Sequence, residues 1–330
     1  MLYNNKTCGL LNLGNTCYLN SVVQCLAYSP SLLLFMEDSE FDLDIVENTK
    51  TTNMVKELRS LLMKLWLNNT DINPIHFKKQ VDHSMLVKNW SGIMMGHQND
   101  AHEFLEFILE CLHEALQYTP NISISKKVEN EKLTSVDKLA LEAYGRWKDH
   151  FKNGYSFIID NFYGQFISEI KKGENISYCF DPFSVLTLEI PDVNQDSFTL
   201  DECLDNFMKV EQLGQNIQKK FYFWKIPKNL VIVIKRFTNN GLKCNKRINY
   251  SDTIDLSKYS KSYERTNIIY KLSSICCHKG DTNFGHYFTL ARKKLKGDWF
   301  KIDDNNIISL ENNGALPLTN AAYILFYHKC

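Results

Sequence analysis

The spacing of apolar residues changes once along the chain, near residue 156, and this change constrains the fold more than any single motif. Before it, apolar residues recur at helical spacing; after it, they alternate or run continuously, as they do in strands. Helices followed by strands predict an α+β chain whose two lobes meet at a cleft. Its 330 residues are enough for one large domain or two ordinary ones.

Start signals locate the helices in the first half. Asp100, followed three residues later by Glu103, suits a capped helix N-terminus, and Pro74 suits a first helical turn. Residues 119–133 are polar and rich in lysine and glutamate, so we expect a mobile surface insertion there. Five helices are expected: one after the stretch GLLNLGNTC, one over Met54–Trp66, one over Pro74–Val81, one that begins near Asn99, and one over Val136–Phe151.

Strands are expected through the second half. NLVIVIKRF is apolar on both faces, as a buried central strand should be. The other expected strands lie in SFIIDNFYGQFISEI, SYCFDPFSVLTLEIP, IYKLSSICCHKG, GHYFTLARKK, DWFKIDD and AAYILFYHK.

Composition excludes several classes of protein. Lys+Arg and Asp+Glu both number 38, so no net field attracts nucleic acid or an anionic membrane. No segment approaches the roughly 20 apolar residues of a membrane span, and the first residues lack the apolar core of a secretory signal. Ten cysteines then indicate free thiols in a reducing compartment, so we expect a cytoplasmic protein with nuclear entry left open. Abundant Asn, Lys and Ile suggest an AT-rich genome, viral or parasitic, and hence a host cytoplasm.

The cysteines do not have the spacing of a metal site. No C-x2-C or C-x4-C pair occurs, and the adjacent Cys276 and Cys277 lie in an expected strand, where neighbours face opposite sides. We therefore expect neither a zinc site nor any other cofactor.

Cys17 is the better candidate for a nucleophile. It follows the Gly- and Asn-containing loop NLGNT at the start of a helix, where the helix dipole stabilises a thiolate. Cys25 lies deeper on the apolar face, where desolvation disfavours a thiolate, so we expect a core residue there.

A base and its orienting acid can be proposed from the second half. His286 stands at the entry to a strand, and an antiparallel return near Gly297 could bring Asp303 beside it. Taken alone, however, a histidine beside a loop is also typical of a surface group. The adjacent pair Asp303 and Asp304 is likewise typical of a turn.

Six stretches that occur in a fixed order favour the catalytic interpretation of these residues over the structural one. GLLNLGNTCYLNSVVQCL, GHQNDAHEFLEFIL, YGRWKDHFKNGYSFIIDNFYGQ, VIVIKRF, GHYFTLARKKLKGDWFKIDD and AAYILFY follow one another. Together they resemble the catalytic domain of the ubiquitin-specific proteases, papain-like cysteine deubiquitinases, from about Thr7 to the C-terminus. The resemblance implies one catalytic domain over 7–330, shaped like a right hand. It consists of a helical thumb at about 7–155, fingers at about 156–225 and a palm at about 226–330.

The resemblance also implies residue roles. Cys17 would be the nucleophile, His286 the general base and acid, and Asp303 the orienting carboxylate. Asn12 would donate its amide to the oxyanion, and Asp304 would be an accessory acid.

Substrate-binding positions are implied by the same resemblance. Gln98, Asp100 and Tyr287 would bind the C-terminal tail of ubiquitin, whereas Asn99 departs from the glutamine usual there. The two C-x2-C pairs that many relatives carry in the fingers are missing around Cys179, so we expect zinc-free fingers.

We therefore expect a deubiquitinating thiol isopeptidase that acts on ubiquitin and ubiquitinated proteins as a monomer. Two alternatives remain: a catalytically silent ubiquitin-binding module, or the same chemistry on a ubiquitin-like modifier.

Overall fold

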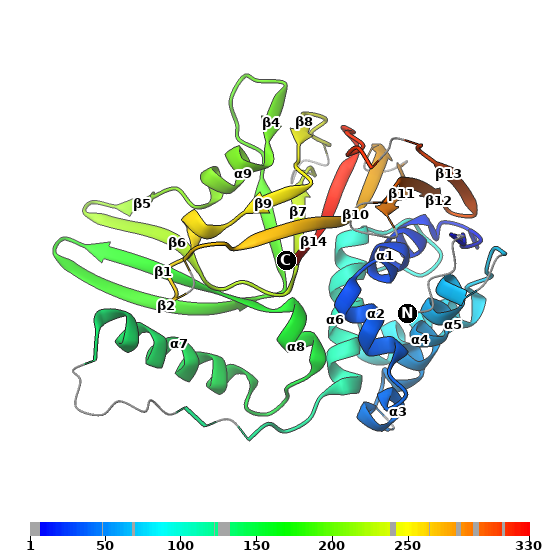
Figure 1. Ribbon diagram of the computed structural model, residues 1–330, viewed down its shortest axis with the longest axis horizontal. Helices are drawn as coiled ribbons and strands as arrows, with labels where there is room; N and C mark the ends of the chain where they lie inside the picture. The colour runs from blue at the N-terminus through cyan, green and yellow to red at the C-terminus, as the bar shows by residue number, and fades with distance from the viewer. Residues whose placement is uncertain are drawn as a thin grey trace.

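Helices occupy the N-terminal half of the chain and strands the C-terminal half, which confirms the α+β class (Figure 1). The computed structural model describes residues 7–47, 49–67, 70–121, 123–124, 133–237, 242–263, 265–281, 285–292, 297–311 and 314–330. Of the expected insertion at 119–133, residues 122 and 125–132 lie outside this part.

Helix α1 is the centre of the helical lobe. All eleven of its residues are buried, because it packs against α4 and α6 on one side and against strands β10 and β11 on the other. The helices of this lobe are α1 (Cys17–Ala27), α2 (Pro30–Glu37), α3 (Phe41–Asp44), α4 (Thr52–Leu67), α5 (Ile75–Lys88) and α6 (Ala101–Leu116).

The expected end of the helix after Pro74 is wrong. Pro74 is the N-cap residue of α5, but the helix continues past Val81 to Lys88. Met85, four residues after Val81, is buried on the same face and extends the apolar stripe. Asn89 then ends the helix in a left-handed conformation (φ 53°).

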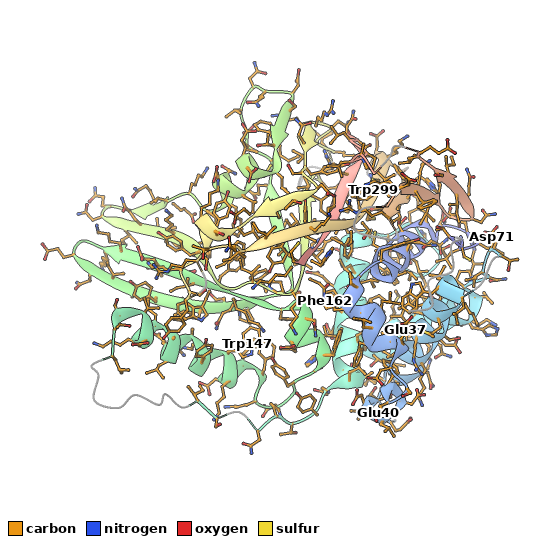
Figure 2. The ribbon with its side chains drawn as sticks, in the orientation of Figure 1. Glu37, Glu40, Asp71, Trp147, Phe162 and Trp299 are labelled. Carbon is orange, nitrogen blue, oxygen red and sulfur yellow. The ribbon has the colours of Figure 1, made fainter. Side chains whose placement is uncertain are left out.

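Part of SFIIDNFYGQFISEI is a helix, which corrects the prediction of a strand there. Phe157–Phe162 form α8, and Ser156 caps it by accepting a hydrogen bond from the Ile159 N–H. The helix packs against α6 and buries Ile158 and Phe162 in the core of the helical lobe, where Figure 2 labels Phe162. The strand begins only at Gly164.

A four-stranded antiparallel sheet in the order β2-β1-β6-β5 projects from the molecule in the position expected for fingers (Figure 1). Helix α7 (Ser135–Phe151) packs along β2 and buries Ala140 and Ala143 against it. The strands are β1 (Gly164–Lys172), β2 (Asn175–Phe183), β5 (Glu211–Gly214) and β6 (Ile217–Lys225).

Aromatic rings fill the base of this sheet. The Phe166 ring lies 4.1 Å from that of Phe183 and 5.4 Å from that of Phe223, and Phe207 and Phe221 extend the group. These rings pack onto the palm core, so the sheet is anchored by apolar contact. We call these five residues the aromatic cluster.

The palm is an eight-stranded sheet. Along the order β13-β12-β11-β10-β14-β7-β3, β7 pairs on both sides and confirms the predicted central strand, while β9 pairs with β10. Strand β3 lies inside the range expected for fingers, yet it pairs with β7. The strands are β3 (Val185–Glu189), β7 (Asn229–Lys235), β9 (Thr253–Asp255), β10 (Ile269–Gly280), β11 (Gly285–Arg292), β12 (Trp299–Asp303), β13 (Asn306–Ser309) and β14 (Ala322–Lys329).

Smaller elements flank the palm. They are β4 (Ser197–Thr199), α9 (Leu200–Phe207), β8 (Arg247–Asn249) and the 3₁₀ helix η1 (Ser257–Tyr259).

The palm sheet separates two cores. Cys276 belongs to the core shared with the helical lobe and Cys277 to the core on the opposite face, as expected for consecutive strand residues.

Within the described part of the chain, no single helix is long and apolar enough to cross a membrane; only α1 and α2 taken together, bent by 83°, have that length and composition.

The central strand supports a stability prediction. Leu230 in β7 is fully buried, so Leu230→Ala should lower the free energy of unfolding by about 2–5 kcal/mol in urea denaturation. Leu43 is 82% exposed, and Leu43→Ala should change it by less than about 0.5 kcal/mol. Equal losses in the two variants would contradict this account of the core.

Candidate active site

A tight turn delivers Cys17 to the first position of α1. Gly14 (φ 90°) and Asn15 (φ 54°) both adopt left-handed conformations, which bend the chain sharply, as the composition of NLGNT predicts. The Asn12 side-chain oxygen fixes the turn by accepting from the Gly14 N–H (2.9 Å) and the Thr16 hydroxyl (3.2 Å). Cys17 thus lies at the positive end of the α1 dipole.

Strand pairing brings His286 and Asp303 together. Strands β11 and β12 are antiparallel with Thr289 opposite Ile302, so the C-terminal end of β12 returns to the start of β11. The His286 Nε2 atom lies 2.5 Å from the Asp303 Oδ1 atom. The antiparallel return inferred from the sequence is confirmed.

Cys17 completes this arrangement from the other lobe. The nearby Cys17 side chain is the largest of the influences that raise the pKa of His286, to about 9. Burial opposes the rise and the hydrogen bond to Asp303 adds to it. With Asp303 bound to Nε2, the Nδ1 side of the ring remains for the Cys17 thiol, an arrangement that suits a nucleophile, a base and an orienting acid.

Asp303 is held ionised by two cationic partners. Burial opposes its ionisation, but the hydrogen bonds from Lys301 and His286 outweigh burial and lower its pKa. The Lys301 Nζ atom lies 2.5 Å from the Asp303 Oδ2 atom, opposite the side that His286 binds. A charged carboxylate therefore faces the imidazolium at neutral pH.

Cys25 has the opposite environment. It is fully buried, and desolvation raises the pKa of its thiol to about 12 although Thr289 and Ser274 partly counter the effect. The prediction that Cys25 is a core residue is confirmed.

Asp304 connects two asparagines near the nucleophile. The side-chain amides of Asn12 and Asn20 each donate to its carboxylate at 2.8 Å. The Asn12 amide carries two hydrogens, and this contact uses one of them. Its role as oxyanion donor stays a prediction, as does the accessory role of Asp304.

The expected substrate-binding residues line one cavity of about 190 Å³ next to the triad. Gln98, Asp100 and Tyr287 line it together with Phe237 and His278. Each of the three also has a structural contact.

Gln98 accepts from the Gly285 N–H (3.3 Å), directly before His286. Both Asp100 oxygens lie 2.8 Å from the Tyr323 hydroxyl, and Asp100 caps α6 by accepting from the His102 N–H, as predicted. The Tyr287 hydroxyl accepts from the Ala101 N–H (3.4 Å).

Asn99 closes a loop beside the nucleophile. Its side chain accepts from the Met94 N–H (2.8 Å) and donates to the carbonyls of Met94 (2.9 Å) and His97 (3.0 Å). The loop reaches the nucleophile turn because Asn15 donates to the Gly96 carbonyl (3.1 Å). Asn99 thus holds its own loop in place.

Two residues of this site escaped sequence reasoning. Asn20 is 2% exposed, one turn after Cys17, and a buried amide in an apolar helix was its only signal. Lys301 lies two residues before Asp303 in β12, so strand alternation puts both on one face.

The site does not fit a metal ion. Among the described residues, His286, Asp303 and Asp304 form the one group whose potential ligand atoms lie within 4.8 Å of one another. Their oxygens already accept bonds from Lys301, Asn12 and Asn20, and Lys301 would repel a cation.

Comparison with known proteins agrees with this geometry. Residues 8–327 match the family model of ubiquitin carboxyl-terminal hydrolases. The chain belongs to that family. It is 30% identical to ubiquitin carboxyl-terminal hydrolase Usp2 of Drosophila melanogaster over 343 residues, 98% of this chain and 35% of that protein. It is 27% identical to ubiquitin carboxyl-terminal hydrolase 4 of Eremothecium gossypii, over 98% of this chain and 43% of the relative.

A solved structure shares the hydrolase fold. The SAGA Ubp8/Sgf11/Sus1/Sgf73 DUB module bound to ubiquitin aldehyde superposes with a TM-score of 0.74 at 25% identity. The match covers 100% of this chain and 71% of that one. This chain thus spans less than half the length of the two curated hydrolases above.

The ring of His286 should titrate with a midpoint near 9 in histidine NMR, because Cys17 and Asp303 stabilise its imidazolium. Cys17→Ala should move the midpoint toward the ordinary value of about 6.5. Since the folded pKa is the higher one, its contribution to stability is complete below about pH 6.5 and lost as the pH rises through about 9.

His278 provides the internal control for this titration. Burial and the nearby Lys243 lower its pKa to about 4, so it should stay neutral across the same range. A midpoint of His286 that Cys17→Ala leaves unchanged would contradict the proposed contact.

Proposed function

We propose that this chain is a thiol isopeptidase that hydrolyses the bond after the C-terminal glycine of ubiquitin. The observation that carries the proposal is the alignment of Cys17, His286 and Asp303 across the junction of the two lobes. Family membership supports it, and so does the ubiquitin aldehyde bound in the Ubp8 structure.

The reaction follows from the charges of the triad. The Cys17 thiolate attacks the glycine carbonyl and forms a tetrahedral oxyanion, toward which the Asn12 amide donates. The imidazolium of His286 gives its proton to the leaving lysine amine, and the intermediate collapses to a thioester. His286, now neutral, takes a proton from water as the water attacks, and the thiolate leaves as the glycine carboxylate forms.

Two other functions remain testable. A silent ubiquitin-binding module would keep the binding surface without turnover, and a related enzyme would act on a ubiquitin-like modifier. The raised pKa of His286 favours an enzyme, because a binding module has no need of a protonated base beside a thiol.

Oligomeric state and location are separate questions. In the similar structures Ubp8 is bound to Sgf11, Sus1 and Sgf73, so these neighbours give no support to the expectation of a monomer. We propose the cytoplasm as the location from composition alone, which cell fractionation would check.

Cys17→Ala should abolish cleavage of a fluorogenic substrate of the ubiquitin C-terminus, since no other thiol lies beside His286 in the described part of the chain. Cys25→Ala is the matched control and should keep most of the activity. A ubiquitin propargylamide probe should label Cys17. Labelling only by probes of ubiquitin-like proteins would identify that modifier instead, and binding without labelling would indicate the silent module.

Asn12→Ala should lower kcat by about 10²–10³ with little change in KM, because it removes a donor that acts in the transition state. Asn20→Ala is the control, since it also removes one amide from Asp304 but no oxyanion donor. An equal loss in both variants would show that support of Asp304, and not oxyanion binding, is the function of Asn12.

A further inference from the structure

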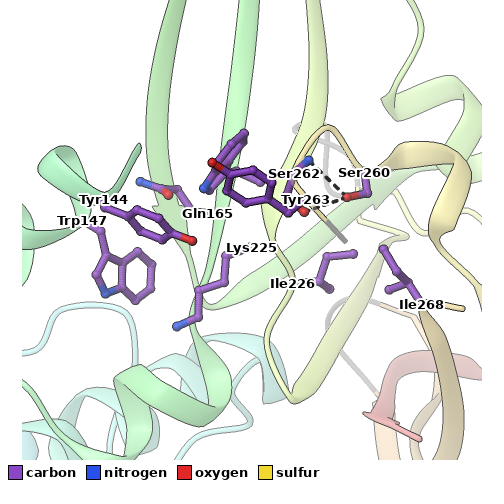
Figure 3. A pocket seen from close by; sticks show the side chains of 10 residues that line it. Tyr144, Trp147, Gln165, Lys225, Ile226, Ser260, Ser262, Tyr263 and Ile268 are labelled. Carbon is purple, nitrogen blue, oxygen red and sulfur yellow. Dashed lines mark hydrogen bonds between the residues drawn. The ribbon is translucent and has the colours of Figure 1, made fainter. Parts of the chain in front are cut away.

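A cavity of about 400 Å³ lies at the base of the fingers, where α7, β6 and the chain after η1 meet (Figure 3). None of its lining residues belongs to the active site or to the cavity around Gln98. Its volume falls in the range of about 300–1,000 Å³ that small-molecule sites occupy. The size alone therefore allows a compact ligand.

The walls of this cavity are largely aromatic. Tyr144 and Trp147 come from α7, Trp224 from β6, and Tyr263 from the chain after η1. Figure 3 shows Tyr144 and Trp147 on one side of the space and Tyr263 above it. Such walls favour a flat, apolar ring, which can stack on or meet their edges.

Most polar groups in the walls are already bonded to other protein groups. The Tyr263 hydroxyl donates to Asp137 (2.6 Å), and the Gln165 amide donates to the Ala143 carbonyl (3.1 Å). The hydroxyls of Ser260 and Ser262 lie 3.1 Å from each other. Lys225 is therefore the wall residue that can recognise a charge on a ligand.

Lys225 is the charged group of the cavity. Its Nζ atom lies 4.0 Å from the centre of the Trp147 ring, and no carboxylate among the described residues forms an ion pair with it. The nearby Asp160 pairs with Lys228 instead (2.7 Å). Burial lowers the pKa of Lys225 to about 8, since the pull of Asp160 is too weak to offset it and Lys228 lowers it further.

We propose that this cavity binds a small aromatic carboxylate, with its ring among Trp147, Tyr144 and Trp224 and its carboxylate on the Lys225 amine. An anion would supply the counter-charge that the cavity lacks, and the ring would fill the apolar remainder. Neither a cation nor a purely apolar molecule would satisfy the amine.

The position of the cavity gives binding a mechanical consequence. Trp147 and Trp224 belong to α7 and to the finger strand β6, and the chain after η1 is joined to β6 through Lys261, whose N–H donates to the Phe223 carbonyl (2.9 Å). A ligand held between Trp147 and Trp224 braces α7 against the finger sheet. This site goes beyond the proposed hydrolase activity, and its occupancy can be measured without turnover.

The test is a ¹⁹F NMR titration of the whole chain with 4-fluorophenylacetate, compared with neutral 4-fluorophenylacetamide. We expect saturable binding of the acid and at least tenfold weaker binding of the amide. Lys225→Met keeps the apolar stem of the side chain and should weaken binding of the acid at least tenfold. Binding should also weaken as the pH rises above about 8, where the amine loses its proton.

Lys148→Met is the matched control, because Lys148 follows Trp147 in α7 but neither lines the cavity nor is among the charges that shift the pKa of Lys225. It should bind the acid like the parent chain, and circular dichroism should show both variants folded. No saturable binding, equal binding of acid and amide, or equal losses in the two lysine variants would each overturn the proposal.

Discussion

The burial of helix α1 between the helical lobe and the palm sheet is the contact on which the active site depends. Cys17 lies on one lobe and His286 on the other, so the proposed triad exists only while the two lobes are docked. Hydroxyls of the palm reach the helix backbone: Thr289 donates to the Ser21 carbonyl (3.0 Å) and Ser274 to the Cys25 carbonyl (3.2 Å). Near the nucleophile the chains approach so closely that a Cβ on Gly9 would lie 2.5 Å from the Asn305 Cα atom.

Asp303 and Asp304, adjacent at the end of β12, differ in the groups that they contact. Asp303 faces a lysine and an imidazolium, and these charges keep it ionised beside the base. Asp304, with φ at 53°, turns away from the strand direction and meets two amides of the helical lobe. Asp303 therefore holds the His286 ring, while Asp304 ties the turn before Cys17 and helix α1 to the palm.

Long periodic segments, and the closeness of His286 and Asp303, could be predicted from the sequence. The apolar run of β7 and the helix after Cys17 have strong local signals, and the β11–β12 pairing follows from the small number of residues between the two strands. The segment Phe157–Phe162 was mistaken for a strand because a short apolar run fits either period; its capping serine decides for a helix. Asn20 acts through Asp304, 284 residues further along the chain, which only tertiary contacts reveal. Lys301 lies two residues before Asp303, so strand alternation could have found it once β12 was recognised.

The aromatic cluster at the base of the fingers has a thermal consequence. Metal-bound fingers are held by coordination bonds, whereas these rings hold the sheet to the palm by apolar contact. Apolar burial weakens on cooling. The attachment of the fingers to the palm in this chain should therefore weaken as the temperature falls.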